Sequence, residues 1–185
     1  IFMAVSKALY KNAMLRDPNA DIGAIMRVAN AEVSRDNPGS LFVTAFAAIL
    51  DLDSGELNYC NAGHDNPYRL HPDGAEPQRI DDGDGPPLCA LPDYDYRGAR
   101  CLLQRGELLC LITDGVTEAL NPGGELYGNQ RLQQQLLRLT QTGATPQQLV
   151  EAVQADVAAF AAGAEAADDL TLLALRWHGP AGAPA

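Results

Sequence analysis

Apolar residues in the first 35 positions recur at the spacing of two α-helices. Residues 1 to about 16 carry apolar side chains three or four positions apart, and a second such pattern runs to Arg35. Asp17-Pro18 separates the two helices, because a residue before proline disfavours the α-helical region. Asn19 or Asp21 is the expected cap of the second helix.

From residue 41 the pattern changes to short runs of β-branched, aromatic and small apolar residues, which predict strands. The expected strands are residues 41–52, 56–62, 68–70, 78–80, 94–103 and 107–113. Asp53-Ser54-Gly55 should join the first two as a hairpin. Arg105-Gly106 should join the last two as a second antiparallel hairpin. Residues 81–92 are rich in glycine and proline and are expected to be irregular loop.

The last third of the chain returns to helical spacing. Residues 130–139 place leucines on one side and glutamines on the other. Thr145 is a good helix cap, because proline follows it and Gln148 stands three positions on; this helix should reach about Ala162. Residues 170–177 form the last expected strand. Hairpins dominate this order of elements, which predicts an α+β fold of antiparallel sheet with helices packed against it.

Composition and charge narrow the range of possible functions. The 185 residues suit one domain with a real core, and 46% hydrophobic and 20% charged residues are ordinary for a globular protein. The formal net charge of −11 argues against a nucleic-acid partner, because binding along phosphates needs a basic surface. A cationic ligand or a divalent metal is easier to accommodate.

The cysteines, the absence of membrane and signal segments and the two ends of the chain bear on the compartment of the protein and on the extent of its domain. None of the four cysteines stands in CxxC spacing, so we expect reduced core thiols of a cytoplasmic protein and no zinc site. No stretch is long enough for a membrane span and no signal peptide is present, so direct membrane insertion by this domain is not expected. The chain begins in mid-pattern, which suggests that an upstream part is missing. Residues 179–185 are expected to be a disordered tail after a domain of residues 1–178.

The first candidate for chemistry is Asp114, which follows the apolar run Leu108–Thr113 at once and precedes Gly115. Burying an unpaired carboxylate at the end of a strand is costly, so it needs a helix N-terminus, an ion pair or a metal. Asp114 therefore either caps the short helical turn expected over Val116–Leu120 or has a metal-binding or catalytic role.

The second candidate is the pair Asp168-Asp169, which opens the apolar run of residues 170–175. If this strand lies antiparallel to the strand before Asp114, the three carboxylates meet at one edge of the sheet. Carboxylates brought together repel unless a cation intervenes, and Mg²⁺ and Mn²⁺ prefer such oxygen ligands. The alternative is that Asp168 and Asp169 only form a turn.

His64, alone in its loop, is either a hydrogen-bonded structural residue or a catalyst.

Five motifs in order carry a resemblance to a known family. They are Phe42-Val43-Thr44-Ala45, Leu57–His64, Leu111–Ala119, Leu126–Leu132 and Asp168–Leu173. Together they resemble the bacterial serine/threonine phosphatases of the stage II sporulation protein E type, relatives of the metal-dependent protein phosphatase 2C superfamily. The resemblance covers nearly all of the chain before the tail.

The resemblance implies an α-β-β-α sandwich, with two antiparallel sheets flanked by helices, and a two-metal Mn²⁺ or Mg²⁺ site. Asp114 matches the metal ligand of the family's Ser-Asp-Gly motif, Asp168 matches the ligand of its Asp-Asp motif, and Asp169 is its neighbour. Metal-activated water would then hydrolyse a phosphoserine or phosphothreonine. His64 falls in a family motif, and we assign it only loop shaping. Thr113 stands where the family has serine, a change that should matter little.

The same analogy implies a role in signal transduction and sigma-factor regulation. The substrate would be a phosphorylated regulatory protein, an anti-sigma-factor antagonist, and an upstream sensor or receiver domain would control activity. The family's first acidic motifs, which supply further metal ligands and two core strands, are absent from this sequence. The chain thus holds part of the site, and sheet edges are expected to be incomplete. The rival hypothesis is a non-catalytic regulatory module that keeps the fold and binds a protein partner, and an unrelated α+β domain is a third.

Overall fold

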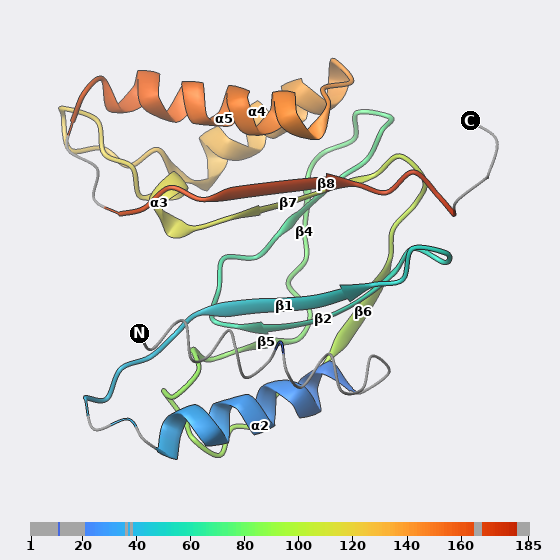
Figure 1. Cartoon of the computed structure of the whole chain (residues 1–185). Coiled ribbons are helices and arrows are strands. Elements are labelled where there is room, and N and C mark those ends of the chain that lie inside the picture. The colour runs from blue at the N-terminus through green and yellow to red at the C-terminus, as the bar shows by residue number, and fades with distance from the viewer. Residues whose placement is uncertain (1–10, 12–20, 36, 38, 165–167, 181–185) are drawn as a thin grey trace. The chain divides into compact units, whose positions relative to one another are not determined.

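The computed structural model describes residues 11, 21–35, 37, 39–164 and 168–180. The helix expected over residues 1–16 lies almost entirely outside them, as does most of the predicted tail. The described chain divides into two compact units. The first consists of the residues up to His64 together with Asp81–Leu103, and the second of Asp65–Ile80 together with the residues from Gln104 onward. Each unit contains one sheet and at least one helix, which confirms the predicted α+β class (Figure 1).

The sheet of the first unit is built on a hairpin. Strands β1 (Ala45–Leu50) and β2 (Glu56–Ala62) pair antiparallel, as predicted. The turn is held by Asp51, whose carboxylate accepts hydrogen bonds from the Asp53 and Ser54 amides at 2.9 and 2.8 Å. These bonds favour the charged form and lower the pKa of Asp51. Strand β6 (Ala99–Leu102) pairs antiparallel with β2, and the short β5 (Asp84–Gly85) pairs with it in parallel.

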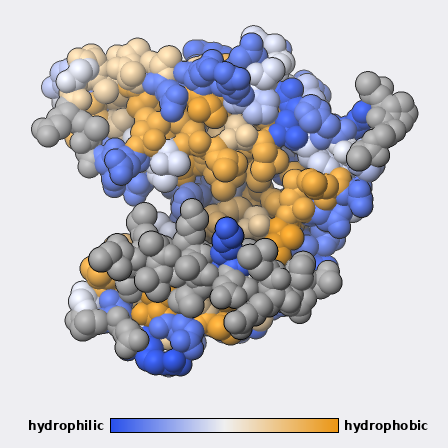
Figure 2. Space-filling model, in the orientation of Figure 1, coloured by the Kyte–Doolittle hydropathy of each residue, from blue (hydrophilic) through white to orange (hydrophobic). Residues whose placement is uncertain are grey.

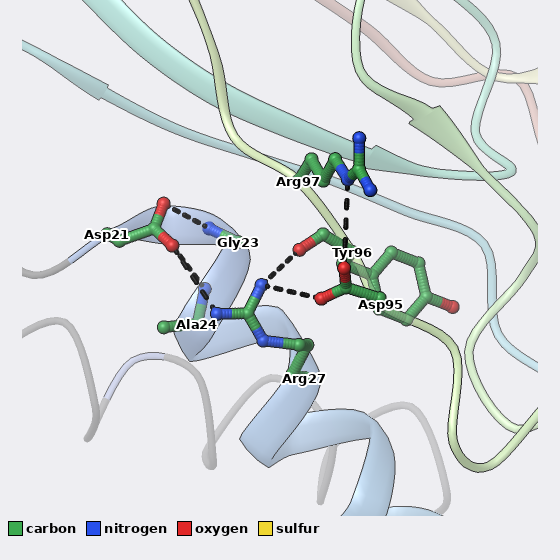
Figure 3. Close-up of polar contacts among 7 residues, drawn as sticks. All are labelled: Asp21, Gly23, Ala24, Arg27, Asp95, Tyr96 and Arg97. Atoms are coloured by element: carbon green, nitrogen blue, oxygen red, sulfur yellow. Dashed lines mark hydrogen bonds and ion pairs between the residues drawn. The ribbon is translucent and has the colours of Figure 1, made fainter.

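Helix α2 (Ile22–Arg35) covers one face of this sheet. Asp21 begins the helix, as one of the two expected caps, by accepting from the amides of Gly23 and Ala24 at 3.1 and 3.2 Å. Arg27 then donates to the Tyr96 carbonyl and pairs with Asp95 at 3.2 Å (Figure 3). The segment before β6 is therefore bound to the helix, which explains why the strand expected from residue 94 begins only at Ala99.

The sheet of the second unit has the order β4-β3-β7-β8, with every pair antiparallel. Its strands are β3 (Tyr68–Leu70), β4 (Gln78–Arg79), β7 (Leu108–Ile112) and β8 (Leu172–Arg176). Leu108, Cys110 and Ile112 pack on helices α4 (Gly128–Gln141) and α5 (Pro146–Ala161) in one core. Alternate residues of a strand point to opposite faces, so the helices cover one face of this sheet.

Helix α5 begins as the sequence predicts. Thr145 accepts from the Gln148 amide at 3.2 Å, and the Gln148 side chain accepts from the Thr145 amide at 2.9 Å. This reciprocal pair is a complete capping box, with Pro146 in the first turn. Helix α4 likewise buries Leu132 and Leu136, as its leucine pattern predicts.

The predicted second hairpin is wrong. Strand β6 pairs with β2, whereas β7 pairs with β3 and β8. The two sides of the turn after β6 have different hydrogen-bond partners. The Leu103 amide donates to the Gly55 carbonyl at 2.9 Å, whereas the Gly106 amide donates to the Trp177 carbonyl at 2.8 Å. Proximity in sequence favoured the hairpin, but the tertiary pairing overrides it.

β8 is an edge strand of the second sheet. Figure 2 shows hydrophobic surface along β7 and β8, where Leu173 is 51% exposed.

None of the helices described by the structure has the length and apolar character needed to cross a bilayer.

Candidate metal centre

The two acidic points predicted from the sequence lie at the same end of the second unit's sheet. Strands β7 and β8 are antiparallel neighbours, with Ile112 opposite Leu172. Asp114 follows the end of β7, and Asp168-Asp169 precede the start of β8. Because antiparallel strands place the end of one beside the start of the next, the expected juxtaposition of these segments is present.

Asp114 lies at the first position of the short helix α3 (Asp114–Thr117), and its side chain is exposed. The N-cap residue is Thr113, and no side-chain cap hydrogen bond is formed. The alternative in which Asp114 caps this helical turn is therefore wrong. A carboxylate in the first turn is still favourable there, because it lies close to the unpaired amides at the helix start.

Asp168 and Asp169 are also exposed and form a bend before β8. One carboxylate oxygen of Asp168 accepts a hydrogen bond from the Asp169 amide at 2.7 Å, which leaves its other oxygen for a further partner. No ion pair to Asp114, Asp168 or Asp169 is formed by any basic residue in the described parts of the chain. Among the described residues, the negative charge at this end of the sheet thus has no ion-pair partner.

Close backbone contact joins the two acidic segments. A Cβ atom on Gly115 would lie 2.5 Å from the Asp169 carbonyl oxygen, so only glycine fits without displacement. The Thr113 hydroxyl donates to that same oxygen at 3.0 Å. The segments of Asp114 and Asp169 are therefore held against each other by backbone and side-chain contacts.

The donor chemistry suits a hard divalent cation such as Mn²⁺ or Mg²⁺, which binds carboxylate oxygens. Within the residues that the structure describes, however, no group of three or more His, Cys, Asp or Glu side chains is arranged to hold a metal. The three aspartates therefore fit one part of a donor set. Their roles as metal ligands stay a prediction.

His64 shapes its loop through its backbone. The buried Asn61 side chain accepts from the His64 amide and donates to the His64 carbonyl, both at 2.9 Å. Asn61 also donates to Asp84 at 3.0 Å, which connects the end of β2 to β5. The histidine was the expected shaping residue of this loop, but the side chain of Asn61, three residues earlier, makes these bonds.

Sequence reasoning missed a second polar cluster, at the other end of β7. Glu107 is completely buried, and one carboxylate oxygen lies 3.1 Å from the Arg69 guanidinium and 2.6 Å from Nδ1 of His71. Its other oxygen accepts from the Gln104 amide at 2.7 Å. An acidic residue directly before a buried apolar strand was the available signal. This cluster is structural, because its groups already bind one another.

Comparison with known proteins shows where this fold and its motifs recur. The chain is 29% identical over 136 residues to Protein IcfG of a Synechocystis species, and 27% identical over 125 residues to the phosphoserine phosphatase RsbU of Bacillus subtilis. These matches cover 74% and 66% of this chain but only 21% and 37% of the two relatives. The chain thus spans a minor part of each relative's length.

Solved structures share the fold. The SiaA-PP2C domain of Pseudomonas aeruginosa superposes with a TM-score of 0.76 at 21% identity, over 95% of this chain and 67% of that one. The family model described as Stage II sporulation protein E matches residues 1–178. The chain therefore belongs to the stage II sporulation protein E family and has the fold of a PP2C-type phosphatase domain.

Proposed function

We propose that the intact protein is a metal-dependent protein serine/threonine phosphatase, and that residues 1–178 belong to its catalytic domain. The observation that carries this proposal is the antiparallel pairing of β7 and β8, which places Asp114 beside the Asp168-Asp169 segment. Family membership supports the same reaction, and the resemblance to PP2C-type phosphatases implies dependence on Mn²⁺ or Mg²⁺.

In this proposal Asp114 and Asp168 bind the metal, and Asp169 is the chain neighbour of Asp168. A bound divalent metal lowers the pKa of a water molecule, so that it can attack phosphorus at neutral pH. The aspartates of this chain would hold and orient that centre, and the negative charge of their carboxylates favours a divalent cation. The cation would in turn offset the repulsion between the three carboxylates and a phosphoryl group.

The relatives support a substrate class for this proposal. One of them is a phosphoserine phosphatase, which supports phosphoserine or phosphothreonine on a protein. We propose a phosphorylated regulatory protein of the anti-sigma-factor-antagonist type, with control by a sensor or receiver domain elsewhere in the protein. Both points rest on the family resemblance.

The test is phosphate release by the full-length protein from a phosphoserine protein, with Mn²⁺ and with EDTA. The expected result is turnover that requires Mn²⁺, with no hydrolysis of a phosphotyrosine peptide. Metal-independent turnover by the folded protein would contradict the proposal.

A second candidate is a non-catalytic module that binds a phosphoprotein without hydrolysing it. The observation that favours it is that the three aspartates, among the described residues, do not form a complete metal-binding group. Binding of the phosphoprotein without phosphate release, with Mn²⁺ present, would support this candidate over the enzyme.

A further inference from the structure

Thr113 connects three segments of the second unit through four hydrogen bonds. Its amide donates to the Thr171 carbonyl at 3.1 Å, and its carbonyl accepts from the Val116 amide at 3.0 Å. Its hydroxyl accepts from the Thr171 amide and donates to the Asp169 carbonyl, both at 3.0 Å. One residue thus joins the end of β7, the start of α3 and the chain that leads into β8.

The hydroxyl takes the place of a backbone acceptor. In a regular antiparallel pair, two opposite residues exchange both of their N–H···O bonds, so the Thr171 amide would bond to the Thr113 carbonyl. Here that amide bonds to the Thr113 hydroxyl, and the carbonyl instead accepts from the first turn of α3. The strand can therefore end and the helix begin at the same residue with these groups satisfied.

This arrangement sets the positions of the acidic residues. Asp114 follows Thr113 directly and begins α3. The Asp169 carbonyl is held by the Thr113 hydroxyl and lies against Gly115, where no side chain intervenes. The Asp169 amide in turn orients the Asp168 carboxylate. The Thr113 hydroxyl therefore makes two of the hydrogen bonds that hold the Asp168-Asp169 segment relative to Asp114.

We infer that Thr113 is a positioning residue for the metal centre, whose hydroxyl holds Asp114 and Asp168 at the separation that a shared divalent cation needs. The inference rests on the proposed function, since it assumes that these aspartates bind metal. Thr113 itself is assigned no contact with metal or substrate. Groups that orient metal ligands in this way typically change metal affinity by about 10- to 100-fold when they are removed.

The experiment compares Mn²⁺ binding by the full-length protein and three variants, measured from the electron paramagnetic resonance signal of free Mn²⁺. Thr113→Val keeps the shape and removes the hydroxyl, whereas Thr113→Ser keeps the hydroxyl and removes the methyl group. Thr171→Val is the matched control, because the Thr171 hydroxyl makes no hydrogen bond within the described residues; only its backbone takes part in the pairing. Thermal unfolding in EDTA shows whether each variant folds without metal.

The expected result is a Kd for Mn²⁺ raised about 10- to 100-fold in Thr113→Val and nearly unchanged in the other two variants. Unchanged affinity in a folded Thr113→Val would overturn the inference while leaving the proposed function intact. Should Thr113→Val fail to fold, Thr113→Ser decides: native affinity supports the hydroxyl as the determinant, and a large loss overturns it. Absence of Mn²⁺ binding by the wild-type protein would overturn the proposed function and this inference together.

Discussion

The carbonyl oxygen of Asp169 lies directly against Gly115, so that a Cβ atom at position 115 would be 2.5 Å from it. Real Cβ atoms do not approach an oxygen so closely, and one of the two segments would have to move. Both belong to the acidic end of the β7–β8 pair. The contact therefore links the packing of the sheet end to the placement of the candidate ligands.

We predict that Gly115→Ala lowers the free energy of unfolding by about 1–3 kcal/mol, the usual cost of forcing an extra carbon into a filled site. It should also weaken Mn²⁺ binding, because the Asp169 segment is displaced. Urea unfolding in EDTA and Mn²⁺ titration measure the two effects. Gly39→Ala is the control, since its added Cβ would meet only Leu41 at an ordinary 3.5 Å. Equal stability of the two variants would show that the Asp169 contact is not a constraint.

Glu107 is the one charged residue that is buried among the described residues, and its neutralisation should be costly. Glu107→Gln keeps the shape but leaves the largely buried Arg69 without its counter-ion. Removing one partner of such a pair should lower the free energy of unfolding by about 3 kcal/mol or more. The comparison is Glu56→Gln, whose partner Arg100 is 3.7 Å away and exposed, and which should cost less than about 1 kcal/mol. Urea unfolding of both variants measures the difference, and similar losses would contradict the role assigned to Glu107.

Buried thiols make the fold sensitive to alkaline pH. Burial raises the pKa of Cys110 from 9.0 to about 12 and that of Cys60 to about 11, because it disfavours the thiolate. Above pH 9 the unfolded chain loses these protons before the folded chain does. The stabilising contribution is therefore complete below pH 9 and is lost as the pH rises toward 11–12.

The expected loss for each thiol at pH 10 is about 1.4 kcal/mol relative to pH 8, since one pKa unit corresponds to that energy. The free energy of unfolding from urea titrations at pH 8, 9 and 10 measures the slope. Cys110→Ala should make the slope shallower by the share of this thiol, leaving that of Cys60, and Cys101→Ala, at a half-buried cysteine, serves as the comparison. An unchanged slope in Cys110→Ala would exclude this thiol as a source of the pH dependence.

Local patterns in the sequence predicted the elements that local interactions determine. The bounds of β2, Glu56–Ala62, follow from its alternating side chains and its flanking turns. The capping box at Thr145 uses only residues three positions apart. The juxtaposition of the Asp114 segment with the Asp168-Asp169 segment was predictable too, because it needs only that β7 and β8 be antiparallel neighbours.

The features that sequence reasoning missed depend on which strands pair. The β6–β7 hairpin was wrong because sequence proximity says nothing about whether two strands join the same sheet. The Glu107 cluster follows from the pairing of β3 with β7, which brings Arg69 and His71 to the start of β7. The bridging role of Thr113 requires a hydroxyl in place of a backbone acceptor, and no pattern of residue types encodes that geometry.

The central claim is that Asp114 binds a catalytic divalent metal. The most direct measurement is the rate of Mn²⁺-dependent phosphate release from a phosphoserine protein by the full-length Asp114→Asn variant. Asp73→Asn is the matched control, because Asp73 is an exposed aspartate whose side chain, among the described residues, accepts only from the Ala75 amide in a turn, as asparagine can. We predict a loss of more than about 100-fold for Asp114→Asn, beyond the range typical of residues that only orient ligands, and native turnover for Asp73→Asn. Native turnover and native Mn²⁺ affinity in a folded Asp114→Asn variant would contradict the account.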